Sequence, residues 1–146
     1  MHTVYLSNEH RKPWEGTLTW SLETLDGEVA KTGLQKVSAK PREAVKICEV
    51  DFSAILDSDP DLARNLVFVA ELWQAEQMVS RQVAYLAPTK HLELKEPEIK
   101  NKVLIEEDIA QITLTSISLA RLVELTLEGE DVVFSDNYFD LPAGHS

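Results

Sequence analysis

Apolar and polar residues alternate along the first part of the chain with a period of two, which is typical of half-buried β-strands. The clearest run covers residues 17–25. Leu18, Trp20 and Leu22 share one face of this run, while threonine, serine and glutamate side chains occupy the other. The pattern therefore predicts a strand that packs one face on a core and turns the other to a polar environment.

A hairpin is expected directly after this strand. Asp26-Gly27 lies between two alternating runs, and it predicts a type I′ turn because both central residues of that turn need a positive φ. The partner strand is expected at 29–39, with a bulge at Gly33. Its expected apolar positions are Leu34, Val37 and Ala39.

Similar signals recur through the rest of the chain. Short apolar, β-branched or aromatic runs separated by turn residues predict further strands at 4–6, 44–50, 66–73, 79–86, 99–105, 109–115, 122–127 and 132–134. Helical signals are confined to 51–56 and to Asp59-Pro60, which is expected to cap and open a short helix ending at Arg64. Strands with frequent turns and so little helix indicate an all-β fold of the sandwich type.

The stretch from Pro88 to Pro97 is the best candidate for a domain boundary. Two prolines bracket a charged segment with little helical periodicity, although a linking strand is equally allowed there. We therefore expect two tandem β-sandwich units, one over residues 1–88 and one over 89–146.

The segment 132–144 is expected to form a strand, a tight corner and a return. Asp136 and Asn137 favour a chain reversal, because their short side chains bond their own backbone. Tyr138 and Phe139 follow at once, so these four residues form the expected corner motif. The arrangement is similar to the tyrosine corner of immunoglobulin-like sandwiches, in which the ring fills the core and the hydroxyl satisfies a backbone group. The alternative is a well-packed turn without that role.

The corner also carries a family resemblance. Ser135–Leu141, followed by Pro142 and Gly144, resembles the signature of the C-terminal immunoglobulin-like domain of β-mannosidases, which are family-2 glycoside hydrolases. The likeness continues upstream through 90–94 and 120–125. Residues 4–8 and 16–20 are similar to the sandwich domain that precedes it in those enzymes.

The resemblance implies a C-terminal piece of a β-mannosidase-like enzyme with two tandem immunoglobulin-like β-sandwich domains. It also implies that the second domain is truncated, with at least one closing strand beyond Ser146. The parent would hydrolyse terminal β-linked mannose with retention, using an acid/base and a nucleophile on an upstream (β/α)-barrel. This chain shows no alternation of strands and helices that could form that barrel, so we expect no catalytic residue in it.

Composition limits the partners. A formal net charge of −11, with few and dispersed basic residues, argues against nucleic acid and against an anionic membrane surface. No apolar run approaches the ~20 residues that span a bilayer. The N-terminus lacks a signal-peptide pattern, which slightly favours a cytoplasmic location. Cys48 is alone, so it forms no intrachain disulfide, and its apolar neighbours indicate a small core residue.

Candidate chemistry is sparse. The acidic clusters 106–108 and 128–131 lie at expected turns, and no pair of carboxylates is recognisable as a glycosidase pair. The segment 57–61 opens like a calcium loop, but Leu62 and Phe68 occupy the glycine and glutamate positions. The histidines lack metal-ligand spacing, and no cofactor motif occurs. Those histidines are His2, His10, His91 and His145.

Trp14 is the one residue singled out for contact with another molecule. It follows Pro13 in a polar stretch, so it is expected in a loop, docked on a neighbouring domain or exposed as a sugar platform. Three hypotheses follow: an accessory scaffold that packs on the catalytic barrel of its parent, a stand-alone carbohydrate-binding module, and an interaction sandwich. An unpaired edge in a truncated second sandwich would also be open to another copy of the chain.

Overall fold

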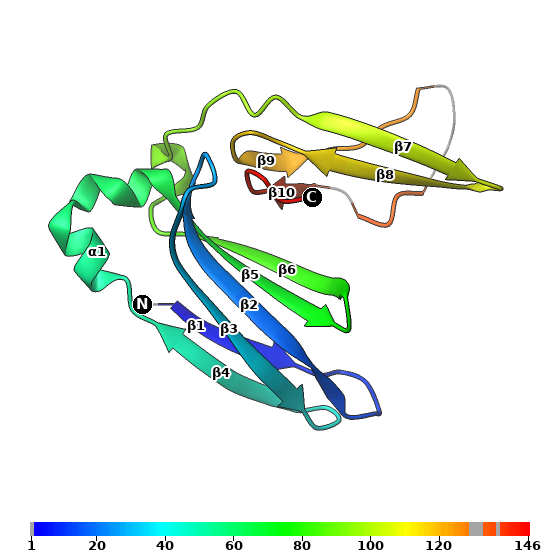
Figure 1. The fold of residues 1–146 in the computed structure, drawn as a ribbon, viewed down its shortest axis with the longest axis horizontal. Helices are drawn as coiled ribbons and strands as arrows, with labels where there is room; N and C mark the ends of the chain where they lie inside the picture. Colours follow the sequence, from blue (N-terminus) through cyan, green and yellow to red (C-terminus); the bar gives the residue numbers. More distant parts are fainter. Residues whose placement is uncertain (1, 129–132, 137) are drawn as a thin grey trace.

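The computed structural model describes residues 2–128, 133–136 and 138–146, and this part of the chain is an all-β protein (Figure 1). The strands of its first half are β1 (His2–Ser7), β2 (Trp14–Thr24), β3 (Val29–Ala39), β4 (Ala44–Val50), β5 (Leu66–Gln74) and β6 (Gln77–Tyr85). Those of its second half are β7 (Lys100–Glu106), β8 (Ile109–Thr115), β9 (Ala120–Val123) and β10 (Phe139–Leu141). The all-β fold predicted from the sequence is confirmed.

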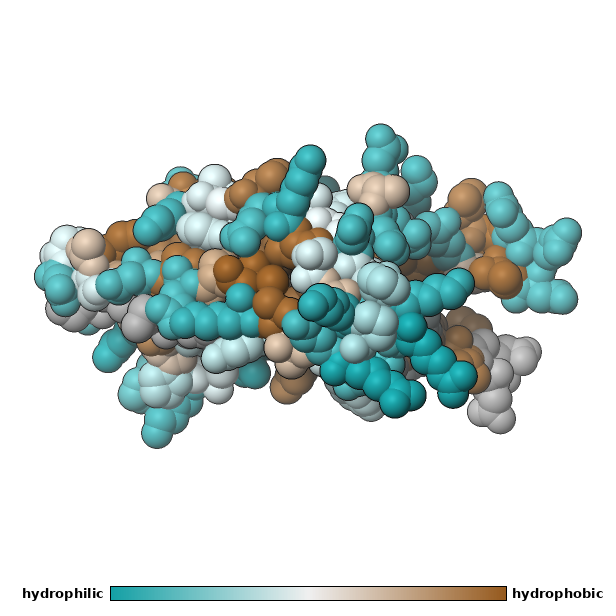
Figure 2. All heavy atoms as spheres, turned by 90° about the horizontal axis from the view of Figure 1, so that it is seen from below, coloured by the Kyte–Doolittle hydropathy of each residue, from teal (hydrophilic) through white to brown (hydrophobic). Residues whose placement is uncertain are grey.

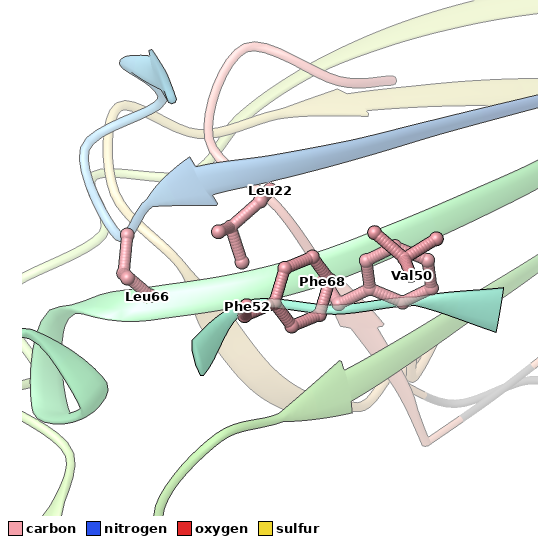
Figure 3. Packing of buried hydrophobic residues seen from close by; sticks show 5 residues of the cluster. All are labelled: Leu22, Val50, Phe52, Leu66 and Phe68. Atoms are coloured by element: carbon pink, nitrogen blue, oxygen red, sulfur yellow. The ribbon is translucent and has the colours of Figure 1, made fainter. Parts of the chain in front are cut away.

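The first half folds as two antiparallel sheets that face each other. One sheet has four strands in the order β3-β2-β5-β6, and the other consists of β1 and β4 (Figure 1). Their inner faces meet in a core cluster (Figure 3). Its members are Leu22, Val50, Phe52, Leu66 and Phe68. Burial of each such side chain stabilises the fold by roughly 1.5–3 kcal/mol, so this cluster is a main source of the sandwich's stability.

The hairpin between β2 and β3 forms where it was predicted, but with a different turn. Gly27 has a φ of 95°, whereas Asp26 does not have a positive φ, so the type I′ expectation is wrong. Instead Gly27 donates its backbone N–H to the carbonyl of Thr24, and the register shifts between Leu22 and Glu23. Leu22 pairs with Lys31 and Glu23 with Val29, so Ala30 is the extra residue and the bulge lies near the start of β3.

Two expectations for β3 are wrong. Leu34 is 73% exposed, because it lies three residues from Val37 and so faces the opposite side of a strand with period two. Gly33 is not at the bulge. A Cβ at Gly33 would lie 2.4 Å from the indole ring of Trp20, so the glycine allows this ring to lie across the neighbouring strand. The bulky Trp20 ring on β2 thus explains why residue 33 of β3 has no side chain.

The helical signals are confirmed as connections between the sheets. Helix α1 (Ser53–Ser58) is followed by the 3₁₀ helix η1 (Pro60–Asn65). The Asp59 side chain caps η1 by accepting a hydrogen bond of 3.1 Å from the backbone N–H of Asp61. The segment between Pro88 and Pro97 holds the short 3₁₀ helix η2 (Thr89–His91) and no strand.

The described residues of the second half form two separate two-stranded sheets, β7–β8 and β9–β10. They meet in a small core cluster of Leu114, Ala120, Val123 and Leu141. The strand expected at 122–127 is shorter and ends at Val123. Of the strand expected at 132–134, Val132 lies outside the described residues and Val133 and Phe134 belong to no strand. The predicted return is present as β10, which pairs with β9.

Candidate functional site

Trp14 is not a loop residue. It is the first residue of β2 and pairs with Ala39 of β3, so its backbone is held in the larger sheet. The ring is partly buried against the cluster that contains Leu18. It also folds over Gly16, where a Cβ would lie 2.1 Å from the ring. The expectation that Trp14 lies in a loop is therefore wrong, and in this structure its partly buried ring packs against the core of the first sandwich.

The corner motif is placed differently from a tyrosine corner. Tyr138 is 63% exposed, has a φ of 58°, and donates its hydroxyl hydrogen to the Glu124 carboxylate over 3.1 Å. The expectation that its ring fills the core is wrong, because the left-handed backbone directs Tyr138 outward. Phe139 packs on the core instead. Asp136 is exposed, and Asn137 lies outside the described residues.

The face of the larger sheet that was expected to be polar is covered by the second half of the chain. Strand register places alternate residues of β2, β5 and β6 on this outer face, among them Val67 and Val69. They pack with Leu25, Leu92 and Leu119 in one buried cluster. Two hydrogen bonds reinforce the contact, because the Leu25 carbonyl accepts from the Leu119 N–H at 2.8 Å and from the Ser118 hydroxyl at 3.2 Å. The two halves therefore share a core, which we call the junction.

A group of charged side chains extends this junction. His145 Nε2 lies 2.8 Å from Glu23 Oε1, and His145 Nδ1 lies 3.6 Å from Glu71 Oε2. Arg81 donates to Glu71 Oε2 from Nε at 2.9 Å and from Nη2 at 2.6 Å, and also to the Ser146 carbonyl at 3.1 Å. We call Glu23, Glu71, Arg81 and His145 the junction charge cluster.

The protonation of this cluster follows from its geometry. Hydrogen bonding to Glu23 and then to Glu71 raises the pKa of His145 from 6.5 to about 9. The charged imidazole can then donate from both ring nitrogens, as two carboxylate acceptors require. Hydrogen bonds from His145 and Arg81 lower the pKa of Glu71. Glu23 is only 2% exposed, and Ser21 donates a further hydrogen bond of 2.6 Å to it. Near neutral pH the cluster therefore holds an imidazolium between two carboxylates.

A second polar contact crosses the junction beside β6. The Tyr85 hydroxyl donates to Asp140 Oδ2, and Asp140 Oδ1 accepts from the Leu122 N–H at 2.8 Å. Arg121 lies over the Tyr85 ring with its guanidinium carbon 5.3 Å from the ring centroid. Burial and the Asp140 carboxylate raise the pKa of Tyr85, so its hydroxyl remains a neutral donor.

A groove of about 520 Å³ runs between β6 and the corner motif. Its lining combines the exposed ring of Tyr138 with Arg81, Gln82, Asp136 and Asp140. Within the described parts of the chain, no group of three or more His, Cys, Asp or Glu side chains could hold a metal ion. Nor is any helix among those residues long and apolar enough to cross a membrane.

Sequence reasoning missed the junction charge cluster. Glu23 was expected on the polar face of its strand, and His145 was considered only in the search for metal-ligand spacing, which it lacks. A signal was present in β5, where Leu66–Val69 form an unbroken apolar run. Such a run is typical of a strand buried on both faces, so the outer face of this sheet needed a cover.

Comparison with known proteins agrees with this architecture. Residues 2–91 match the model of the mannosidase Ig/CBM-like domain, and residues 94–146 match that of an Ig-fold domain of mannosidases. No curated protein matches the chain. These two adjoining matches make the chain an accessory region of the mannosidase type. The chain belongs to the family of mannosidase Ig/CBM-like domains, and in this chain that domain is followed by the Ig-fold domain of mannosidases.

Proposed function

We propose that the chain is the non-catalytic scaffold of a β-mannosidase-like glycoside hydrolase, whose parent polypeptide hydrolyses terminal β-linked mannose with retention. The observation that carries this proposal is the pair of adjoining mannosidase-type matches, at 2–91 and 94–146. The partner would be the catalytic barrel of the same parent chain. The predicted domain boundary after residue 88 stays a prediction.

The junction supports a mechanical role. A shared apolar cluster and the partly buried junction charge cluster hold the second sandwich on the outer face of the first. A scaffold needs such rigidity, because a support that bends at its own joint cannot hold the loops of a neighbouring domain in place. In the proposed parent, the tandem would bury apolar barrel surface and keep active-site loops in position.

The test compares this chain with the full polypeptide encoded by its gene on a chromogenic β-mannoside. We expect hydrolysis by the full polypeptide only, with the β-anomer of mannose formed first, as a retaining mechanism requires. In the full polypeptide, His145→Gln should shorten the half-life of activity on heating and leave the product anomer unchanged. Hydrolysis by neither protein would contradict the proposal.

A second candidate function, oligosaccharide binding, is favoured by the groove beside β6. An exposed tyrosine ring next to a guanidinium, an amide and carboxylates offers both a stacking surface and directional hydrogen bonds, the usual means of fixing a polar ligand. Titration with manno-oligosaccharides tests this function by calorimetry. Tyr138→Ala should abolish binding, whereas Tyr5→Ala, which removes an equally exposed tyrosine on β1, should not. Equal effects of both variants would exclude the groove as the site.

A further inference from the structure

The hairpin of β7 and β8 exposes an unusual amount of apolar surface. Every residue of both strands except Leu114 is exposed, and Ile105 and Ile109 are 71% and 74% exposed. Figure 1 shows the hairpin projecting past the other strands, and Figure 2 shows apolar residues at the surface at the same end of the molecule. A two-stranded hairpin is marginally stable in water by itself. We therefore expect a partner to cover this apolar surface.

The outer edge of β7 indicates what kind of partner fits. In the described part of the chain β7 pairs only with β8, so its other edge presents open backbone donors and acceptors to an incoming strand. β7 carries Lys100 and Lys102 towards one end and Glu106 at the other, and Lys100 and Glu106 are equally far from Val103. An antiparallel copy centred on Val103 would set Lys100 of each copy opposite the partner's Glu106, and Lys102 opposite the partner's Leu104.

We propose that β7 pairs with β7 of a second copy of this chain, antiparallel about a two-fold axis at Val103, so that two hairpins form one four-stranded sheet. Lys100 then faces the partner's Glu106 at both ends of the contact. On one face of the sheet Val103 meets the partner's Val103, with Ile105 of each copy beside it. Such a contact is isologous and closes after two copies.

A parallel arrangement of the two β7 strands is less favourable. Parallel pairing in register would set Lys100 opposite the partner's Lys100 and Glu106 opposite the partner's Glu106, which repel. The formal charge of −11 also makes two copies repel at long range, so only a register with local attraction can hold them together. The antiparallel register supplies that attraction twice.

Sedimentation velocity of the whole chain over a range of concentrations tests the proposal. We expect the apparent mass to rise reversibly with concentration from that of the 16.4 kDa monomer towards twice that value. Val103→Lys should abolish this rise, because it places two like charges on the two-fold axis. The matched control is Leu34→Lys, since Leu34 is also an exposed residue on an edge strand, β3. This variant should dimerise as the unsubstituted chain does. Circular dichroism confirms that each variant is folded.

Charge reversal tests the register. K100E and E106K each turn both attractive contacts into repulsive ones, and should weaken dimerisation at least tenfold. An equimolar mixture of the two variants restores opposite charges at both contacts, so it should form a heterodimer at concentrations where neither variant dimerises alone. A chain that stays monomeric at all concentrations, or a mixture that associates no better than its components, would overturn the proposal. The apolar hairpin would then belong to a different partner, such as the parent's catalytic domain.

Discussion

His145 makes the stability of the chain depend on pH in a range where few other groups titrate. Its pKa is raised from 6.5 to about 9 by hydrogen bonds to Glu23 and Glu71. Since one pKa unit corresponds to about 1.4 kcal/mol, the protonated form stabilises the fold by roughly 3 kcal/mol. This contribution is fully present below pH 6.5 and is lost as the pH rises through 9, because the folded state binds the proton more tightly than the unfolded state.

The perturbation is His145→Gln, which keeps a hydrogen-bonding side chain and removes the titratable charge. The assay is urea unfolding at pH 6, 7.5 and 10, followed by far-UV circular dichroism for the whole chain. Tryptophan fluorescence reports the first sandwich alone, because Trp14, Trp20 and Trp73 all lie in its larger sheet.

We expect the variant to be less stable than the unsubstituted chain by roughly 3 kcal/mol at pH 6 and by little at pH 10. The difference between the two proteins isolates His145, since every other titrating group is common to both. A stability difference that does not change between pH 6 and pH 10 would show that His145 acts by packing alone, and would refute the charge argument.

Three further substitutions test packing and polar contacts, each by urea unfolding at neutral pH. Gly33→Ala should cost about 1–3 kcal/mol and shift the fluorescence of Trp20, because the added Cβ would lie 2.4 Å from the indole; unchanged fluorescence would contradict this contact. Phe52→Ala should cost about 3–5 kcal/mol by opening a cavity in the first core, and a loss below 1 kcal/mol would refute its central place. Tyr85→Phe should cost about 2 kcal/mol, because Asp140 loses a partly buried hydrogen-bond donor. If the double variant Tyr85→Phe/Asp140→Ala lost as much stability as the two single variants together, the two groups would not be coupled, which would contradict this interaction.

The strands of the first sandwich were predictable because their signals are local. Alternation located the strand that contains Leu18 and Leu22, and the segment 29–39 was predicted with the bounds that β3 has in the structure. Turn type was harder to predict. The bulge at Ala30 depends on how β3 pairs with β2, and Asp26-Gly27 is compatible with more than one turn.

The candidate site was not predictable in the same way, because it depends on contacts between distant segments. His145 and Glu23 are 122 residues apart in the chain, and no local pattern relates them. Trp14 was misplaced because Pro13 and the polar residues before it resemble a loop, whereas pairing with Ala39 draws Trp14 into the sheet. Tyr138 was misplaced because a corner sequence does not determine which of two adjacent aromatic residues turns inward.

The junction charge cluster also shows why two neighbouring carboxylates need not form a glycosidase pair. A general acid must hold its proton near neutral pH, so its pKa has to be raised by an apolar pocket or by a like charge. Glu71 experiences the opposite environment, since His145 and Arg81 both donate to it and lower its pKa. His145 also contacts both Glu71 and Glu23, so it bridges the two carboxylates. The register of β2, β5 and β6 thus brings acidic and basic groups together, and these groups link the two sandwiches. The same contacts that strengthen this link make Glu71 a poor proton donor.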